Sequence, residues 1–148
     1  AAAAAAAAAR ASARPGAGAP SPQCSADLKS AGSALGTATA NIARAVFQCP
    51  WNGTACASDV TGVVTYLAQA SEHVADAAKD CAGVNANCAK AIAGVAEELG
   101  KAGQEASKAA VDCPRLQLKA CAGDVAVTSA DLAGMVSSIA KAIVICAI

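Results

Sequence analysis

Aromatic side chains are nearly absent from this sequence of 148 residues, which has one Phe, one Trp and one Tyr. Phe47, Trp51 and Tyr66 are too few to form the platform on which single-stranded nucleic acids stack their bases. The 11 basic residues are balanced by 11 acidic ones, so the formal net charge is zero. Because no excess of positive charge is left to neutralise phosphates, we do not expect nucleic-acid binding.

Residues that commonly carry catalysis are also scarce. His73 is the single histidine, and no nucleophile stands at a motif spacing from it. The CxxC motif of thiol oxidoreductases does not occur, and neither does the close Cys/His spacing of zinc sites. We therefore predict a protein that is not an enzyme, with no catalytic residue, cofactor or metal ion. His73 is expected to be solvated, and a metal or pigment ligand is the alternative.

Long apolar runs are missing as well, although Ala is abundant. The longest uncharged stretches, such as 30–43 and 45–58, end after 14 residues and contain polar, Gly or Pro positions. A helix that crosses a bilayer needs roughly 18–20 apolar residues. We expect no transmembrane span in this chain.

Cysteine, in contrast, is frequent and regularly placed. A cysteine is followed 25 positions later by another in four frames, Cys24–Cys49, Cys56–Cys81, Cys88–Cys113 and Cys121–Cys146. When each frame is numbered from its first cysteine as zero, positions 4, 7, 11, 14, 18 and 21 are apolar, except for Thr128, and position 11 is always Leu. Alternating steps of four and three are the a/d spacing of an α-helix, and the two cysteines are the first and last members of the pattern. We call these eight positions the seam.

The repeated seam predicts an all-α fold. Each frame is expected to be one helix of about 26 residues, roughly 38 Å long. Four such helices with short connections predict an up-down-up-down four-helix bundle, in residues 24–148, stapled at both ends by disulfides. Residues 1–23 are rich in Ala, Pro and Gly and are expected to be an extended arm or the remnant of a leader. Four glycines inside the frames are expected to let neighbouring helices come into close contact: Gly62, Gly94, Gly103 and Gly134.

Eight cysteines in a small helical chain predict a disulfide framework and an oxidising compartment. One helix holds its two cysteines much too far apart for a bridge, so only cysteines at the same end of the bundle can pair. An up-down arrangement places four at each end: Cys24, Cys81, Cys88 and Cys146 at one, and Cys49, Cys56, Cys113 and Cys121 at the other.

The second of these ends is expected to hold two bridges that close its loops, Cys49–Cys56 and Cys113–Cys121. At the first end, Cys81–Cys88 with Cys24–Cys146 competes with Cys24–Cys81 plus Cys88–Cys146. We favour the first arrangement, because the spacing from Cys81 to Cys88 equals that of the loop bridge Cys49–Cys56.

Polar residues near the helix starts are interpreted as structural. Pro22 is expected in the first turn of the first helix, and Thr54 and Asn87 are candidate N-caps. Three acids stand at position 3 of their frames, where a first-turn carboxylate would complement the helix dipole. They are Asp27, Asp59 and Asp124.

Apolar residues beyond the seam predict a docking surface. Phe47 lies off the seam and Trp51 lies in the first loop, where they either pack over the bundle end or anchor a partner. Val144, Ile145 and Ile148 extend the apolar surface at the end of the last helix. We expect these five residues to contact a partner protein.

The frames resemble the Cys-framed, Ala-rich helical repeat proteins that are widespread in dinoflagellate algae. The resemblance is carried by ACASDVTGVVTYLAQASEHVADAAKDC at 55–81 and ACAGDVAVTSADLAGMVSSIAKAIVIC at 120–146, which share a Cys-Ala-x-acid-Val start, a central Leu-Ala and a closing Cys. Ser25 and Ala91 depart from this pattern in the other two frames. The family has no catalytic residues to carry over.

The resemblance implies a small subunit on the lumenal side of a photosynthetic membrane complex, photosystem I or its antenna. We therefore expect a non-enzymatic structural subunit in the thylakoid lumen, with protein partners. The alternative is a secreted or lumenal carrier of a lipid or small molecule. The adjacent CC and the CxC of plant lipid-transfer proteins are missing, and an Ala-rich seam is expected to leave little of the several hundred Å³ that a ligand site needs.

Overall fold

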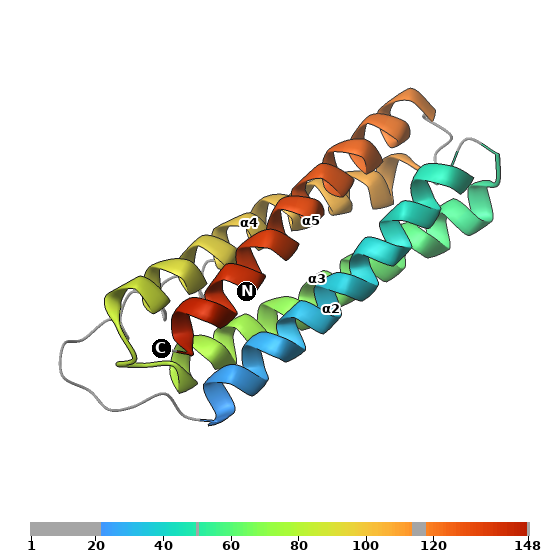
Figure 1. The fold of residues 1–148 in the computed structure, drawn as a ribbon. Coiled ribbons are helices and arrows are strands. Elements are labelled where there is room, and N and C mark those ends of the chain that lie inside the picture. The colour runs from blue at the N-terminus through green and yellow to red at the C-terminus, as the bar shows by residue number, and fades with distance from the viewer. Residues whose placement is uncertain (1–21, 50, 114–117, 148) are drawn as a thin grey trace.

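The computed structural model describes residues 22–49, 51–113 and 118–147, without the side chain of Leu118. These residues form four helices and no strand: α2 (Pro22–Gln48), α3 (Gly53–Asp80), α4 (Ala86–Asp112) and α5 (Leu118–Cys146). The helices run alternately up and down along a common direction (Figure 1). The predicted four-helix bundle is confirmed.

The seam forms the core of the bundle. Every seam position in all four frames is buried, from Cys24 at the start of the first to Cys146 at the end of the last. Four further buried residues lie beside the seam: Ala34, Ser71, Ala78 and Ala96. The two buried hydroxyls are satisfied by carbonyls one turn earlier in their own helices, Ser71 Oγ by Leu67 (3.0 Å) and Thr128 Oγ1 by Asp124 (2.8 Å).

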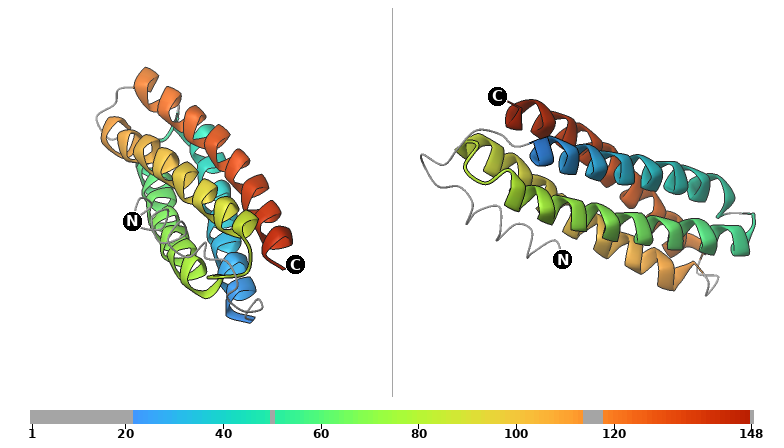
Figure 2. Two further views of the ribbon diagram at one scale, coloured as in Figure 1. Left: turned by 90° about the vertical axis from the view of Figure 1, so that its left-hand side faces the viewer. Right: turned by 90° about the horizontal axis from the view of Figure 1, so that it is seen from below.

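The four helices associate as two hairpins. Helix α2 packs most extensively on α3, and α4 packs on α5, whereas the α2–α5 and α3–α4 contacts that join the hairpins are smaller. The helices occupy the four corners of an elongated bundle (Figure 2). We call α2–α3 the first hairpin and α4–α5 the second.

All four disulfides lie within a hairpin. Cys49–Cys56 and Cys113–Cys121 close the two loops, as expected. At the other end, however, the bridges are Cys24–Cys81 and Cys88–Cys146. The pairing that we favoured there, Cys81–Cys88 with Cys24–Cys146, was wrong. Four disulfides fit an oxidising compartment.

Helix packing explains this correction. Cys24 and Cys81 lie on the closely packed helices of the first hairpin, with their Cα atoms 4.7 Å apart, and Cys88 and Cys146 lie likewise on the second, at 4.9 Å. The contact between α3 and α4 is the least extensive of the four. Spacing along the chain measures loop length and carries no information on which neighbouring helix comes closest.

Helices α3 and α4 begin earlier than the sequence patterns suggested, whereas α2 begins where it was expected. Pro22 is the first residue of α2, as expected. The caps are Asn52 for α3, whose Oδ1 accepts a hydrogen bond from the Ala55 amide (3.1 Å), and Asn85 for α4, whose Oδ1 accepts from the Cys88 amide (2.6 Å). The prediction of Thr54 and Asn87 as N-caps was therefore wrong, since each lies two residues after the actual N-cap.

The acids at position 3 of their frames also lie outside the first turn of their helices. No acidic residue occupies the first turn of α2, α3 or α5. Asp27, Asp59 and Asp124 lie in the second turn, where the field of the helix terminus has largely decayed. The expected stabilisation through the helix dipole is therefore wrong for these three residues.

Only one of the four glycines singled out in the sequence lies at a close helix contact. A Cβ atom added to Gly62 would stand 2.8 Å from Asn41 Nδ2 of α2, so Gly62 brings the helices of the first hairpin together. A Cβ atom added to Gly94, Gly103 or Gly134 would meet nothing within 4 Å. The expectation of close contact is thus correct for Gly62 alone.

Helix α5 is more apolar than the uncharged runs suggested. From Lys119 to Cys146 it is long and apolar enough, by length and composition, to cross a membrane. A core helix of a soluble protein passes the same test. In this bundle α5 buries its seam and is joined to α4 by a disulfide at each end. The absence of a transmembrane span remains a prediction.

The two disulfides of the first hairpin should differ in their contributions to stability. Cys24–Cys81 closes a separation of 57 residues and Cys49–Cys56 one of 7. Because loop-closure entropy grows with the logarithm of loop length, replacing the first pair by Ala should lower the free energy of unfolding by about 2 kcal/mol more than replacing the second. Denaturant unfolding of the two double variants measures the difference. Equal losses would show that the long bridge does not constrain the unfolded chain.

Candidate functional site

The cysteines form two clusters of four sulfurs, one at each end of the bundle. At what we call the Cys24 end, one sulfur comes from each of the four helices, and the same holds at the Cys49 end. Within each cluster all four sulfur atoms lie within 4.8 Å of one another. The two disulfides at each end are therefore in contact, although no disulfide joins one hairpin to the other.

The Cys49 end carries two exposed aromatic side chains. Phe47, in the last turn of α2, is 80% exposed, and Trp51, in the loop to α3, is 87% exposed. Val46 and Val111, near the ends of α2 and α4, are also exposed at this end. Of the two interpretations of Phe47 and Trp51, packing over the bundle end is wrong, because side chains that covered the core would not be so exposed.

The other predicted docking residues lie at the opposite end of the bundle. Val144 is 64% exposed, and Ile145 is half-buried against the core at the Cys24 end. Together with Ser137, Ala140 and Lys141 they border a shallow hollow of about 410 Å³. Ile148 lies outside the described residues. The four predicted docking residues that the structure describes therefore do not form one surface, since a helix length of about 40 Å separates the two groups.

A groove of about 850 Å³ runs between α3 and α4, where the hairpins are least closely packed. Apolar side chains line it from both helices, including Val64, Leu67 and Leu99, and Gly100 and Gly103 leave room for it. Its polar lining residues are Ser71, Gln104, Ser107, Lys108 and Asp112. The groove could not be predicted from the sequence, because it arises from the separation of two helices. It is open to solvent and lies beside the buried seam, so the expectation that the seam itself leaves little ligand space stays a prediction.

His73 stands apart from both cysteine clusters. It is half-buried in a small hollow between α2 and α3, with Tyr66, Gln69 and Ser30 among its neighbours. Among the described residues, the sets of three or more side chains that could share a metal ion are the two cysteine clusters, and His73 belongs to neither. This part of the chain gives no support to a metal-ligand role for His73.

In each hairpin, a carboxyl group of one helix pairs with a carboxyl group of the other helix near a disulfide. The sequence patterns did not predict these two pairs. In the first hairpin, burial of Asp27, its hydrogen bond with Asp80 and repulsion by Asp80 and Asp76 raise the pKa of Asp27 from 3.8 to about 6. The pairing joins position 3 of one frame to position 24 of the next, beside Cys24–Cys81. A proton on Asp27 below about pH 6 removes the repulsion between the two facing acids.

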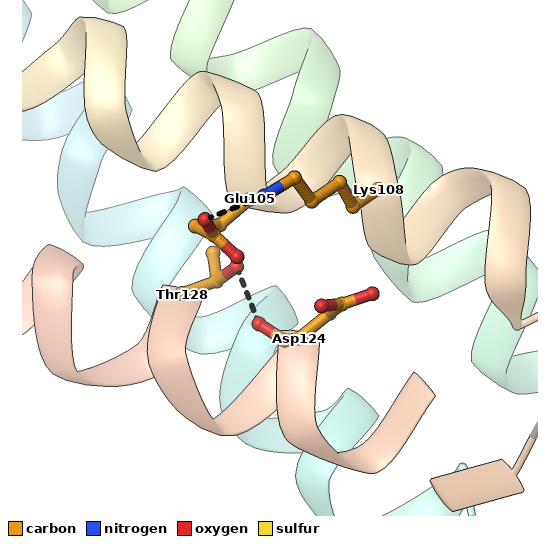
Figure 3. Close-up of polar contacts among 4 residues, drawn as sticks. All are labelled: Glu105, Lys108, Asp124 and Thr128. Carbon is orange, nitrogen blue, oxygen red and sulfur yellow. Dashed lines mark hydrogen bonds and ion pairs between the residues drawn. The ribbon is translucent and has the colours of Figure 1, made fainter. Parts of the chain in front are cut away.

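The second hairpin repeats this arrangement at the Cys49 end. Burial raises the pKa of Asp124, and a hydrogen bond with Asp112 and repulsion by Asp112 and Glu105 add to the effect, while Lys108 opposes it. Figure 3 shows Glu105 and Lys108 of α4 beside Asp124 and Thr128 of α5, with the Lys108 ammonium 3.2 Å from Glu105 Oε1. The pair Asp124 and Asp112 thus connects α5 to α4.

The Asp27 pair predicts that stability rises as the pH falls. With a folded pKa near 6 and an ordinary value of 3.8, the folded state binds a proton that the unfolded state does not bind between these values. The free energy of unfolding should therefore increase as the pH is lowered from 7 to 5. Thermal unfolding against pH measures this, and Asp27→Asn should reduce the dependence.

Asp80→Asn tests how much Asp80 contributes to the raised pKa of Asp27. It removes the repulsion by Asp80 but leaves Asp27 half-buried and still facing Asp76, so part of the pH dependence should remain. A wild-type stability that falls steadily from pH 7 to 5 would contradict the assignment of a raised pKa to Asp27.

Comparisons of the chain with protein-family models, with curated proteins and with solved structures find no match. No relative therefore supplies a site residue or an activity. The resemblance to the dinoflagellate repeat proteins remains a prediction.

Proposed function

We propose that this protein is a non-enzymatic structural subunit that docks on a larger assembly through the aromatic Cys49 end. The observation that carries the proposal is the exposure of Phe47 and Trp51, two of the three aromatic residues in the chain, at one tip of the bundle. Large aromatic side chains dominate the energetics of protein interfaces. Displaying both of them to water is unfavourable unless a partner covers them.

The backbone around Trp51 is held in place, which favours tight docking. The Trp51 amide donates a hydrogen bond to the Gln48 carbonyl (2.9 Å), and the Asn52 amide donates to the same oxygen (2.8 Å). Asn52 also caps α3, and Cys49–Cys56 closes the loop. A loop that is already ordered loses little conformational entropy when a partner binds.

The partners that we propose are protein subunits of a membrane-bound complex, approached from its lumenal side. The disulfides fit an oxidising compartment. The thylakoid lumen, and photosystem I or its antenna as the assembly, follow from the dinoflagellate resemblance. Val144 and Ile145 at the opposite end offer a second, smaller apolar surface, so a partner there would be a different subunit from the one bound by the aromatic end.

Truncation of the aromatic end should weaken docking without unfolding the protein. In a complex isolated from the native compartment, Trp51→Ala and Phe47→Ala should each reduce retention of the protein by about 30-fold, the effect of losing an interface anchor worth about 2 kcal/mol. The thermal midpoint should stay close to that of wild type, because both side chains are exposed.

Val136→Ala, on the exposed face of α5, is the matched control and should leave retention unchanged. Crosslinking should connect the Cys49 end to a partner subunit. If the Phe47 and Trp51 variants are retained like wild type, docking through the aromatic end is wrong. If native crosslinking finds no partner at all, the subunit proposal itself is wrong.

The groove between α3 and α4 favours one second candidate, a carrier of an elongated apolar molecule. Its volume of about 850 Å³ lies within the range of small-molecule sites, roughly 300–1,000 Å³. Val64 and the exposed Val111 offer apolar contact, and Lys108 stands at the groove for an anionic head group. A fatty acid has both of these features.

Displacement of a fluorescent fatty acid tests the carrier function. Saturable binding that is abolished by Gly103→Leu, which fills the groove, would support it. Gly36→Leu on α2 is the control, since an added Cβ meets nothing within 4 Å at either glycine. Binding that is absent, or insensitive to Gly103→Leu, would exclude the groove as a carrier site.

A further inference from the structure

The two cysteine clusters offer a ligand set that the disulfides conceal. Each of the four helices contributes one cysteine to each end of the bundle. At the Cys49 end, Cys56 Sγ of the first hairpin lies 3.7 Å from Cys121 Sγ of the second, although these atoms belong to different disulfides. The clusters are shielded from water, since no cysteine is more than 5% exposed.

We propose that, in the reduced chain, each end of the bundle is a tetrathiolate site for a zinc ion. The described chain would then bind two zinc ions, one with Cys24, Cys81, Cys88 and Cys146 and one with the other four cysteines. Structural zinc sites of proteins commonly use four cysteine thiolates in tetrahedral geometry. The sequence showed no zinc motif, because the ligands come from four helices and are distant in the chain.

The distances between the sulfurs fit this geometry. With Zn–S bonds of about 2.3 Å, the sulfurs of a tetrahedral site lie about 3.8 Å apart. The Cys56–Cys121 distance is already 3.7 Å, and all sulfurs of a cluster lie within 4.8 Å of one another. Once the disulfide bonds are broken, side-chain rotation is enough to bring the four sulfurs around one ion.

The helices hold these ligands in position. Cys81 and Cys113 are C-cap residues, with their amides bonded to Ala77 and Ala109, and the Cys49 amide is bonded to Ala45. Cys88 lies in the first turn of α4, where its amide is bonded to the Asn85 cap. Because the cysteine backbones are fixed by helix hydrogen bonds, the ligand set is preorganised in any state that keeps the helices together.

A dithiol converts the disulfide form into the thiol form that binds zinc. At each end two molecules of a dithiol reduce the two disulfides and become two cyclic disulfides, and the protein gains four thiols. Zn²⁺ then displaces four protons and leaves a site with a net charge of −2. Asp27, Asp59 and Asp124 lie one helical turn from cysteines, and acidic side chains beside a site of net charge −2 reduce its affinity for the ion without removing a ligand.

Zinc would change which helices are cross-linked. The disulfides join α2 to α3 and α4 to α5, whereas one zinc ion joins all four helices at its end. The zinc form would thus hold the two hairpins together before oxidation, when otherwise only the loop from α3 to α4 and the packing between the hairpins connect them. This step is independent of any docking partner.

Metal titration of the reduced full chain tests the proposal. The chain is reduced under anaerobic conditions and titrated with Co²⁺, whose visible absorption reports both the geometry and the number of thiolate ligands. We expect two Co²⁺ per chain with the spectrum of tetrahedral four-thiolate coordination, stoichiometric displacement by Zn²⁺, and a rise in helix content on binding.

The double variant Cys88→Ala/Cys146→Ala removes two ligands from the Cys24 end and should lower the stoichiometry from two to one. Cys113→Ala/Cys121→Ala should do the same at the Cys49 end, so that misfolding of one variant does not prevent the test. Spectra with two thiolates per ion would overturn the proposal, because they mean binding within single hairpins. Octahedral spectra, or a stoichiometry that neither variant changes, would overturn it as well.

Discussion

Closure of each helical hairpin by two disulfides is the constraint on which the rest of this structure depends. The Ala-rich seams contribute little apolar area per turn, so packing alone provides modest stabilisation. Cys24–Cys81 and Cys49–Cys56 fix the register of the first hairpin at both ends, and the second hairpin repeats the arrangement. Once each pair is held, small side chains such as Ala38 and Ala70 need only fit against their neighbours to bury the seam. No disulfide joins one hairpin to the other, so between the described helices only the loop from α3 to α4 and the packing of the helices connect them.

Most of the fold could be predicted, because the alternation of four and three steps fixes which side of each helix is buried. Cysteines at both ends of every seam also predicted the partition into two sets of four. The pairing of Cys24 with Cys81 could not be predicted, since it depends on α2 approaching α3 more closely than α4 approaches α3. The prediction of the N-caps was wrong by two residues, since Asn52 and Asn85 each lie two residues before the predicted Thr54 and Asn87.

The functional surfaces were predicted less well than the core. Phe47 and Trp51 were identified by composition, because aromatic residues are rare here, but only the topology shows that Val144 lies at the opposite end. The carboxyl pair Asp27–Asp80 and the groove beside Gly103 depend on distances between helices. A seam pattern describes one helix at a time, so features shared by two helices escape it. The sulfur clusters are the exception, since every frame ends in the same residue type.

The most direct test of this account is cleavage between the hairpins. A protease site introduced into the loop at residues 82–85, the only described segment that joins α3 to α4, allows the oxidised chain to be cut once and analysed by mass under denaturing conditions without reductant. If all disulfides lie within hairpins, the two fragments will separate completely, and each will contain two intact disulfides. If the fragments stay linked until a reductant is added, at least one bridge joins the hairpins, and the account of two independently closed hairpins is wrong.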